Sequence, residues 1–213
     1  MKLFAFLLPA IAMAYKPSLE IHVMSQCPDA AYCFKHLIQP TLSSVGSLVK
    51  FTQSFIGTVT ESGVACKHGP SECLGNMLHL CGDNIGFSGC LFEDYEKVTQ
   101  KEFVKSCAEK NGLDFENINQ CASDIGEDGG LQRLERSVDR SDKAGVRISC
   151  TVRLEGKTVC VRDGDEWKNC PGGHKVEDLV KQVKEANKRG NRQTLDGAFR
   201  KFRDEGKINW IEL

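Results

Sequence analysis

The N-terminal part of the chain shows two hydrophobic patterns in succession, one with the period of a strand and one with the period of a helix. Leu19–Met24 reads L-E-I-H-V-M and alternates apolar and polar side chains, which predicts a strand with one buried face. Cys27 follows, and Pro28 suits the first turn of a helix because its missing N–H is not needed there. Apolar residues at helical spacing then predict that helix, namely Phe34, Leu37, Ile38 and Leu42.

Later segments complete the predicted elements. The run 49–60 is rich in β-branched and aromatic residues and is predicted to form one strand. Arg147–Leu154 and Lys157–Arg162 are short strand-like runs around Glu155-Gly156, where glycine gives the backbone freedom of a tight hairpin. A final amphipathic helix is predicted by Val176, Leu179, Val180 and Val183. The predicted order is β-α-β, a long insertion, then β-β-α.

This order of elements is typical of a thioredoxin-like α/β domain, here with a cysteine-rich, mainly helical insertion at about residues 63–144. A length of 213 residues with 40% hydrophobic content favours one domain with a real core. We expect the domain to span residues 15–190, followed by a tail, 191–213, that is either a short packed helix or a loosely held end. Residues 1–14 contain a lysine, an apolar run and an A-x-A triplet, which predicts a secretory signal peptide rather than a membrane anchor.

Cysteine content and charge limit the classes of function. Eleven cysteines in a chain that enters the secretory pathway predict several disulfides, because that environment is oxidising. The count is odd, so at least one thiol is free, reactive or paired between molecules. Loss of Lys2 with the signal peptide leaves 27 of the 28 basic residues against 29 acidic ones, without a long run of either sign. Nothing in this balance indicates binding to nucleic acid or to a membrane surface.

The segment Cys66–Cys81 fixes cysteines, a histidine, a glycine, a glutamate and an asparagine at set offsets. It reads C-K-H-G-P-S-E-C-L-G-N-M-L-H-L-C. It resembles the signature of the gamma-interferon-inducible lysosomal thiol reductase family, C-Q-H-G-x2-E-C-x2-N-x4-C, with Lys67 where the family usually has glutamine. A second block, Cys107–Leu131, resembles another family segment, and the resemblance as a whole covers roughly residues 19–185.

The chain departs from the family at the expected active site. The resemblance implies a C-x-x-C motif, whereas this chain reads C-P-D-A-A-Y-C from Cys27 to Cys33. Ala30 takes the position of the second family cysteine, and Cys33 lies about one helical turn further on the same face. If residues 28–33 are regular helix, about 9 Å separates the Cα atoms of the two cysteines, more than the roughly 7 Å of a relaxed disulfide. Either the segment is irregular and Cys33 resolves a mixed disulfide with Cys27, or Cys27 works with another thiol.

Cys27 is the candidate catalytic nucleophile. The redox cysteine of thioredoxin-like domains lies at the turn between the first strand and its helix. Backbone N–H groups and the helix dipole stabilise a thiolate there, and the thiolate is the species that attacks a disulfide. The alternative is a structural half-cystine that ties the start of the helix to the insertion.

Cys150 is a third candidate. Aligning Glu155-Gly156 with the Asn-Gly turn of the family places Cys150 where family members usually have the proline of Val-Pro-Trp, facing the redox turn. One hypothesis is that Cys150 forms the reversible bond with Cys27. The alternative is a structural bridge among Cys150, Cys160 and Cys170 that clamps the hairpin.

The signature also offers four possible zinc ligands, Cys66, His68, His79 and Cys81. Oxidation in the secretory pathway favours disulfides instead, so these cysteines, with Cys73 and Cys90, are more simply half-cystines of a compact helical insertion. His68 and Glu72 either cap and hydrogen-bond within the insertion or assist proton transfer near the redox cysteine.

The predicted function is that of a thiol-disulfide oxidoreductase of the secretory pathway, as the resemblance implies. Its partners are disulfide-containing protein substrates and a small thiol reductant. The sequence lacks phosphate-loop and dinucleotide motifs, and neither a cofactor nor a metal is expected. It has no N-x-S/T triplet, so secretion and a lysosome- or vacuole-like compartment both stay open. The alternative function is a catalytically inactive, disulfide-stapled thioredoxin-like binding protein.

Overall fold

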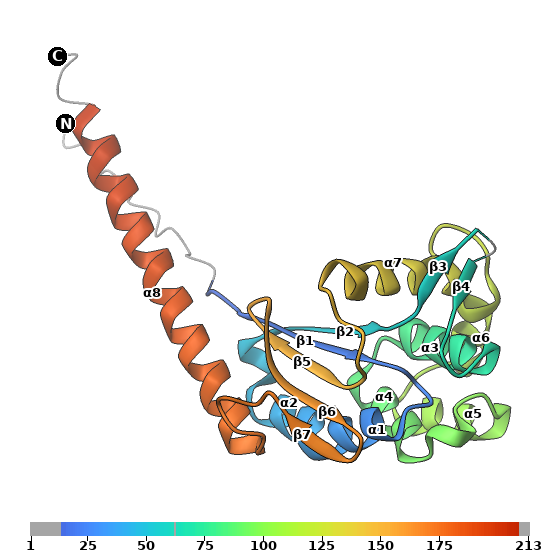
Figure 1. Ribbon diagram of the computed structural model, residues 1–213. Helices are drawn as coiled ribbons and strands as arrows, with labels where there is room; N and C mark the ends of the chain where they lie inside the picture. The colour runs from blue at the N-terminus through green and yellow to red at the C-terminus, as the bar shows by residue number, and fades with distance from the viewer. Residues whose placement is uncertain (1–13, 62, 209–213) are drawn as a thin grey trace.

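A five-stranded sheet in the order β2-β1-β5-β6-β7 lies at the centre of the described residues, which are 14–61 and 63–208 (Figure 1). Residues 1–13 of the expected signal peptide lie outside that part of the chain. Strand β1 is parallel to β2, and the other neighbouring pairs are antiparallel. The strands are β1 (Ser18–Val23), β2 (Lys50–Phe55), β5 (Thr151–Leu154), β6 (Lys157–Asp163) and β7 (Glu166–Lys168).

Helices cover both faces of this sheet. Leu19, Ile21 and Val23 alternate along β1, are fully buried, and share one core with the helical residues that follow Cys27. His22 points to the opposite face, where its Nδ1 lies 2.8 Å from Ser141 Oγ of the helix α7 (Gly130–Lys143). The predicted alternation of the first strand is therefore confirmed.

The helix after Cys27 is continuous but changes its winding. It begins as α1 (Pro28–Cys33), passes through a π-helical turn (Phe34–Ile38) and continues as α2 (Gln39–Val45). Pro40 lies inside α2, and the wider turn before it accommodates a residue that cannot donate the usual backbone hydrogen bond. A short 3-10 turn, Gly46–Leu48, leads into β2.

The predicted single strand over 49–60 is wrong, because the chain breaks after β2. The second piece, β3 (Thr58–Thr60), pairs with β4 (Gly63–Ala65) in a separate two-stranded ribbon. Gly57 stands at the break, where a Cβ atom would meet the Ala65 carbonyl oxygen at 3.1 Å. The β-branched composition predicted extended backbone but carried no information about this close approach.

The predicted hairpin between β5 and β6 is confirmed, but its first strand begins at Thr151 and not at Arg147, because the preceding residues form the bend that carries the Ser149–Cys150 cis peptide. Glu155 and Gly156 both have left-handed backbone, with φ of 52° and 72°. Strand β7 was not predicted, since it is only three residues long and follows a tight turn at Gly164-Asp165, both also left-handed.

The insertion between β4 and β5 is mainly helical, as expected. Its helices are α3 (Pro70–Gly82), α4 (Ile85–Glu93), α5 (Lys101–Lys110), α6 (Phe115–Ser123) and α7 (Gly130–Lys143), with a 3-10 turn at Tyr95–Lys97. Part of it has a core of its own around Phe87 and Leu91. Three disulfides cross-link it, Cys66–Cys73, Cys81–Cys121 and Cys90–Cys107, which confirms the prediction of half-cystines in a compact insertion.

The last helix, α8 (Val176–Ile208), is much longer than the predicted amphipathic segment. Leu179, Val183 and Ala186 of its first half are buried against the domain. The second half projects away from the body (Figure 1), so the expected boundary at residue 190 falls inside one helix. In the ranges that the structure describes, no helix combines the length and apolar character that crossing a bilayer requires.

Candidate active site

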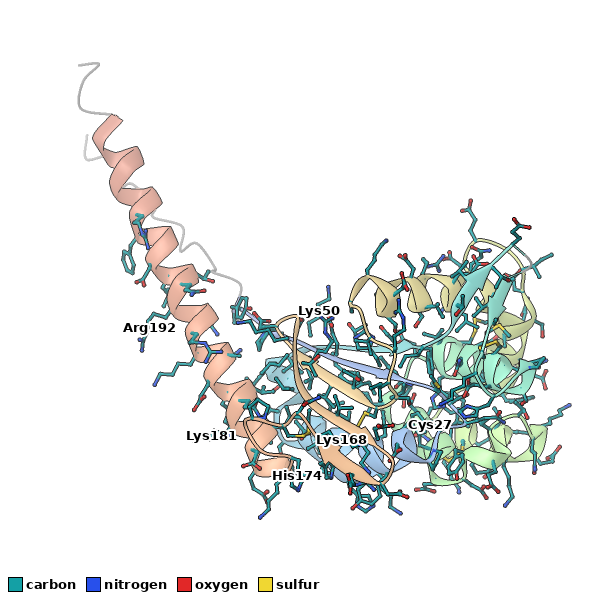
Figure 2. All side chains as sticks on the ribbon, in the orientation of Figure 1. Cys27, Lys50, Lys168, His174, Lys181 and Arg192 are labelled. Atoms are coloured by element: carbon teal, nitrogen blue, oxygen red, sulfur yellow. A yellow bond between two sulfur atoms is a disulfide. The ribbon has the colours of Figure 1, made fainter. Side chains whose placement is uncertain are left out.

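Cys27 lies at the turn between β1 and α1, as the sequence predicted (Figure 2). Its N–H donates to the Met24 carbonyl at 3.1 Å, and its own carbonyl accepts from Ala31 N–H at 3.1 Å, so it forms the N-cap of α1. All eleven cysteines fall within the described ranges, and Cys27 is the one whose thiol is free. The side chain is half-buried, which leaves the sulfur accessible from one side.

The other two candidate cysteines are bonded to each other. Cys33 and Cys150 form a disulfide with a Cα–Cα distance of 6.4 Å, and both side chains are fully buried. Neither pairing considered for Cys150 from the sequence is present, because Cys160 instead bonds Cys170. Since residues 28–33 form a regular helix, Cys33 is carried away from Cys27 and into the core, where it meets the strand that Cys150 precedes.

A short segment before β5 brings Cys27 and this disulfide together. The Cys27 thiol donates to the carbonyl oxygen of Ser149 at 3.7 Å, and Ser149 is bonded to Cys150 through a cis peptide. Met24 N–H donates to Ser149 Oγ at 3.0 Å, while Cys150 exchanges two backbone hydrogen bonds with Arg162 at 3.0 and 2.9 Å. The segment is thus fixed between the redox turn and β6. Ser149 was not among the residues predicted to matter.

The Cys27 sulfur opens on a cavity of about 380 Å³. Its lining combines the redox turn, the start of the signature, the segment before β5 and the β6–β7 turn: Met24, Cys27, Pro28, Asp29, Lys67, His68, Arg147, Ile148, Ser149, Asp163 and Gly164. The sheet, the helix and the insertion therefore all contribute to one opening beside the free thiol.

Asp29, which lines this cavity, is held by Arg162 behind it in β6. Their side chains are largely buried and form an ion pair at 3.2 Å. The Asp29 carboxylate also accepts from the N–H groups of Gly164 at 2.9 Å and Asp165 at 3.2 Å, which ties the β6–β7 turn to the first turn of α1. The Arg162 guanidinium stacks over the Tyr32 ring at 4.0 Å from its centroid. This group was also missed from the sequence.

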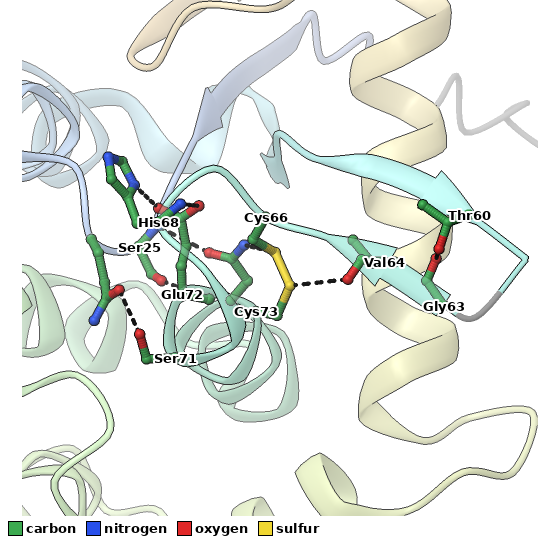
Figure 3. The surroundings of a disulfide bond; sticks show 11 residues. Ser25, Thr60, Gly63, Val64, Cys66, His68, Ser71, Glu72 and Cys73 are labelled. Atoms are coloured by element: carbon green, nitrogen blue, oxygen red, sulfur yellow. Dashed lines mark hydrogen bonds and ion pairs between the residues drawn. A yellow bond between two sulfur atoms is a disulfide. The ribbon is translucent and has the colours of Figure 1, made fainter.

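The signature residues anchor the redox turn to α3 (Figure 3). Ser25 N–H donates to Asn76 Oδ1 at 2.9 Å, and Ser25 Oγ donates to the Glu72 carbonyl at 3.0 Å. Glu72 is fully buried, and its carboxylate accepts from His68 N–H at 3.3 Å and pairs with the His68 ring. Two roles were expected for His68 and Glu72, hydrogen bonding within the insertion and proton transfer near Cys27. The contacts observed correspond to the first role.

The four possible zinc ligands of the signature are separated from one another. Cys66 and Cys81 are bonded to Cys73 and Cys121. His79 is buried near Ser88, whose Oγ lies 3.0 Å from its Nδ1, and burial lowers the pKa of its imidazole to about 3. No cluster of potential metal ligands occurs among the described residues.

A sheet in this order, with a cysteine at the turn after its first strand, defines a thioredoxin-like protein. The fold is similar to that of a thiol-disulfide oxidoreductase, MdbA, from Actinomyces oris, with a TM-score of 0.57, 13% identity, and coverage of 83% of this chain and 82% of that one. It is also similar to reduced DsbA1 from Neisseria meningitidis, with a TM-score of 0.53, 12% identity and coverage of 82% and 87%. The predicted fold class is confirmed.

Residues 18–125 match the family model described as gamma interferon inducible lysosomal thiol reductase, and the chain belongs to this family. It is 29% identical to GILT-like protein 1 of Drosophila melanogaster over 129 residues, which are 54% of this chain and 51% of that protein. A GILT-like protein of Caenorhabditis elegans is 29% identical over 119 residues, 49% of this chain and 36% of its own. The chain thus spans about half the length, or less, of these curated relatives.

Proposed function

We propose that this protein is a thiol-disulfide oxidoreductase that reduces protein disulfides through the thiolate of Cys27. The observation that carries the proposal is the accessible free thiol of Cys27 at the redox turn, in a chain whose ten other cysteines are paired. Membership of a thiol reductase family supports the same activity.

The first step is nucleophilic attack on a substrate disulfide. The Cys27 thiolate bonds to one substrate sulfur, the substrate S–S bond breaks, and the second substrate sulfur leaves as a thiolate that takes up a proton. The aligned peptides of the helix that begins at Pro28 favour negative charge at this end. A second thiolate then attacks the Cys27 sulfur, which releases the first substrate sulfur as a thiolate that takes up a proton and leaves a disulfide between Cys27 and the attacking group. A further thiol attacks the sulfur of that group and frees Cys27.

Cys33 and Cys150 supply a second redox pair beside the nucleophile. Because both sulfurs are fully buried, a dissolved thiol does not reach them directly. Cys27 is in contact with the residue before Cys150, so its thiolate exchanges with the bridge, forming Cys27–Cys150 and releasing the Cys33 thiolate. One molecule of a small thiol reductant attacks the accessible Cys27 sulfur and releases the Cys150 thiol, and a second molecule removes the first from Cys27 as a small-molecule disulfide. Cys27, Cys33 and Cys150 are then all thiols, and Cys150 resolves a later mixed disulfide on Cys27.

We place the activity in the secretory pathway, either outside the cell or in a lysosome- or vacuole-like compartment. The five disulfides support this location, since such bonds persist in oxidising compartments. We keep residues 15–190 as the reductase domain and 63–144 as its insertion. The substrates are disulfide-containing proteins, and the reductant is a small thiol.

The activity is tested by reduction of insulin disulfides with a small thiol donor, using the chain from residue 15 onward at acidic and neutral pH. Wild type is expected to accelerate reduction, while Cys27→Ser and Cys27→Ala reduce the rate to that of the thiol alone. Ser43→Ala, which removes an exposed hydroxyl on α2, serves as the matched control and is expected to keep full activity. Equal rates for wild type and Cys27→Ser would sink the proposal.

A second candidate function is a non-catalytic binding protein. Ala30 at the usual position of the second cysteine, and the burial of the Cys33–Cys150 bridge, favour this alternative. It predicts that Cys27 forms no mixed disulfide with a substrate peptide under conditions in which wild type remains folded.

A further inference from the structure

Two cations line the cavity beside Cys27, and at least one of them has no carboxylate partner among the described residues. Lys67 lies on its rim and is exposed, and within the described part of the chain no carboxylate lies within ion-pair distance of its ammonium. Lys67 is also the signature position at which this chain differs from the usual glutamine of the family. The rim therefore has a cation that the ordinary signature lacks.

Arg147 is a second cation that lines the same cavity. Its guanidinium pairs with Asp142 and donates to the Val146 carbonyl at 3.1 Å. The side chains of this ion pair are 61% and 64% exposed, so the pair is weak and leaves the guanidinium available to another anion. The neighbouring Ile148 is 45% exposed and gives the opening an apolar edge.

The carboxylates that line the cavity do not neutralise these cations, because they are engaged elsewhere. Asp29 is held by Arg162 and by two backbone N–H groups. Asp163 pairs with Lys168 at 2.9 Å, although this pair is also exposed and holds its carboxylate less firmly than Arg162 holds Asp29. His68, the remaining titratable group of the lining besides Cys27, pairs with the buried Glu72. Lys67 and Arg147 are thus left to face an incoming molecule.

We propose that Lys67 and Arg147 form a carboxylate-binding subsite beside Cys27, which selects thiols and disulfides that carry a carboxylate close to sulfur. This inference rests on the proposed function of Cys27. The ligand chemistry is shared by small carboxylate-bearing thiols, such as a cysteine-containing peptide thiol, and by an acidic residue next to a cystine in a protein. The two cations raise the local concentration of a carboxylate-bearing ligand near the Cys27 sulfur. By holding the carboxylate, they also orient the ligand sulfur for attack, which lowers the barrier to exchange.

The subsite is tested by alkylating Cys27 in the chain from residue 15 onward with iodoacetate and iodoacetamide, which differ in charge but attack the same sulfur. The readout is the ratio of the two rates, measured by mass spectrometry of the Cys27 peptide. Lys67→Gln combined with Arg147→Gln is expected to lower this ratio three- to tenfold. Lys50→Gln combined with Lys157→Gln removes the same two positive charges at exposed positions at the opposite end of the sheet, serves as the control for net charge, and is expected to leave the ratio unchanged.

Two further measurements extend the test: the salt dependence of the alkylation ratio, and a comparison of disulfide substrates that differ in charge. Raising the salt concentration from 0.05 to 0.5 M is expected to lower the wild-type ratio towards that of the double variant, because the Debye length falls from about 14 Å to about 4 Å. Glutathione disulfide is then compared with cationic cystamine, and a cystine peptide flanked by glutamate with its glutamine counterpart. A preference confined to glutathione disulfide assigns the subsite to the reductant, and one confined to the peptide assigns it to the substrate.

The outcomes separate this inference from the proposed function. If Cys27 reacts readily but the ratio is the same in wild type and double variant, the subsite is refuted and the oxidoreductase proposal stands. If Cys27 reacts with neither reagent faster than in unfolded protein, the proposed function itself fails.

Discussion

The thiol of Cys27 lies 3.7 Å from the carbonyl oxygen of Ser149, the residue that immediately precedes the bridged Cys150. A free thiol is therefore adjacent to a disulfide that connects α1 to the segment before β5. In place of two cysteines on one helical turn, a free cysteine at the start of α1 contacts the residue next to a bridge that begins at the end of α1. We therefore expect that removal of Cys33 and removal of Cys150 have different effects on which cysteines are bonded.

Removal of Cys33 should create a new bond. In Cys33→Ser, Cys150 loses its partner and is expected to pair with Cys27, so the protein should contain no free thiol. In Cys150→Ser, Cys33 and Cys27 are separated along a regular helix and are expected to stay apart, which leaves two free thiols. Thiol titration of the denatured, unreduced proteins and peptide mapping measure this. Two free thiols in Cys33→Ser would show that Cys27 does not reach Cys150.

The Cys33–Cys150 bridge should also contribute strongly to stability, because it links residues 117 apart in sequence. The double variant Cys33→Ala, Cys150→Ala is expected to lose about 2–4 kcal/mol of unfolding free energy in urea denaturation. Cys160→Ala with Cys170→Ala, which opens a loop of 10, is the control and should lose about 1–2 kcal/mol less. Equal losses would mean that the long bridge does not restrict the unfolded chain.

The ion pair of Asp29 and Arg162 should be worth more than the exposed pairs of the molecule. Asp29→Asn leaves the buried guanidinium of Arg162 with only the longer, solvent-exposed pair to Asp165 at 3.5 Å and weakens two hydrogen bonds at the β6–β7 turn, so we expect a loss of about 3 kcal/mol. Asp163→Asn breaks an exposed pair with Lys168 and should cost less than about 1 kcal/mol. Urea denaturation of the two variants compares them, and similar losses would contradict the structural role of Asp29.

Stability should fall with acidity because of His79. Burial lowers the pKa of its imidazole to about 3, below the ordinary 6.5, so between these values the unfolded chain binds a proton that the folded chain does not. The contribution of His79 to the free energy of unfolding is fully present above pH 6.5. It is lost as the pH falls, and the loss reaches about 2 kcal/mol at pH 5. Burial also lowers the pKa of His22, which acts in the same direction. His79→Gln is expected to flatten the dependence measured by urea denaturation at pH 7 and 5, and an unchanged slope would exclude His79 as its source.

The hydrophobic pattern was sufficient for the elements that position Cys27, because the alternation along β1 and the helical spacing after Pro28 are local features. The partner of Cys33 could not be predicted, since it depends on how β5 packs against α1. The division of 49–60 into β2 and β3 also depends on a tertiary contact, at Gly57. Ser149 has no sequence signal except its place before Cys150.

Ser25 is hydrogen-bonded to Asn76 and Glu72 of α3, so the placement of the proposed nucleophile Cys27 depends on a part of the protein that is itself cross-linked by disulfides. Strongly reducing conditions would break the disulfides of the insertion, and so loosen α3, while they keep Cys27 in the thiol form. The protein therefore has an upper limit to the reducing strength in which it stays competent. A dithiothreitol titration that follows activity and circular dichroism together would locate this limit.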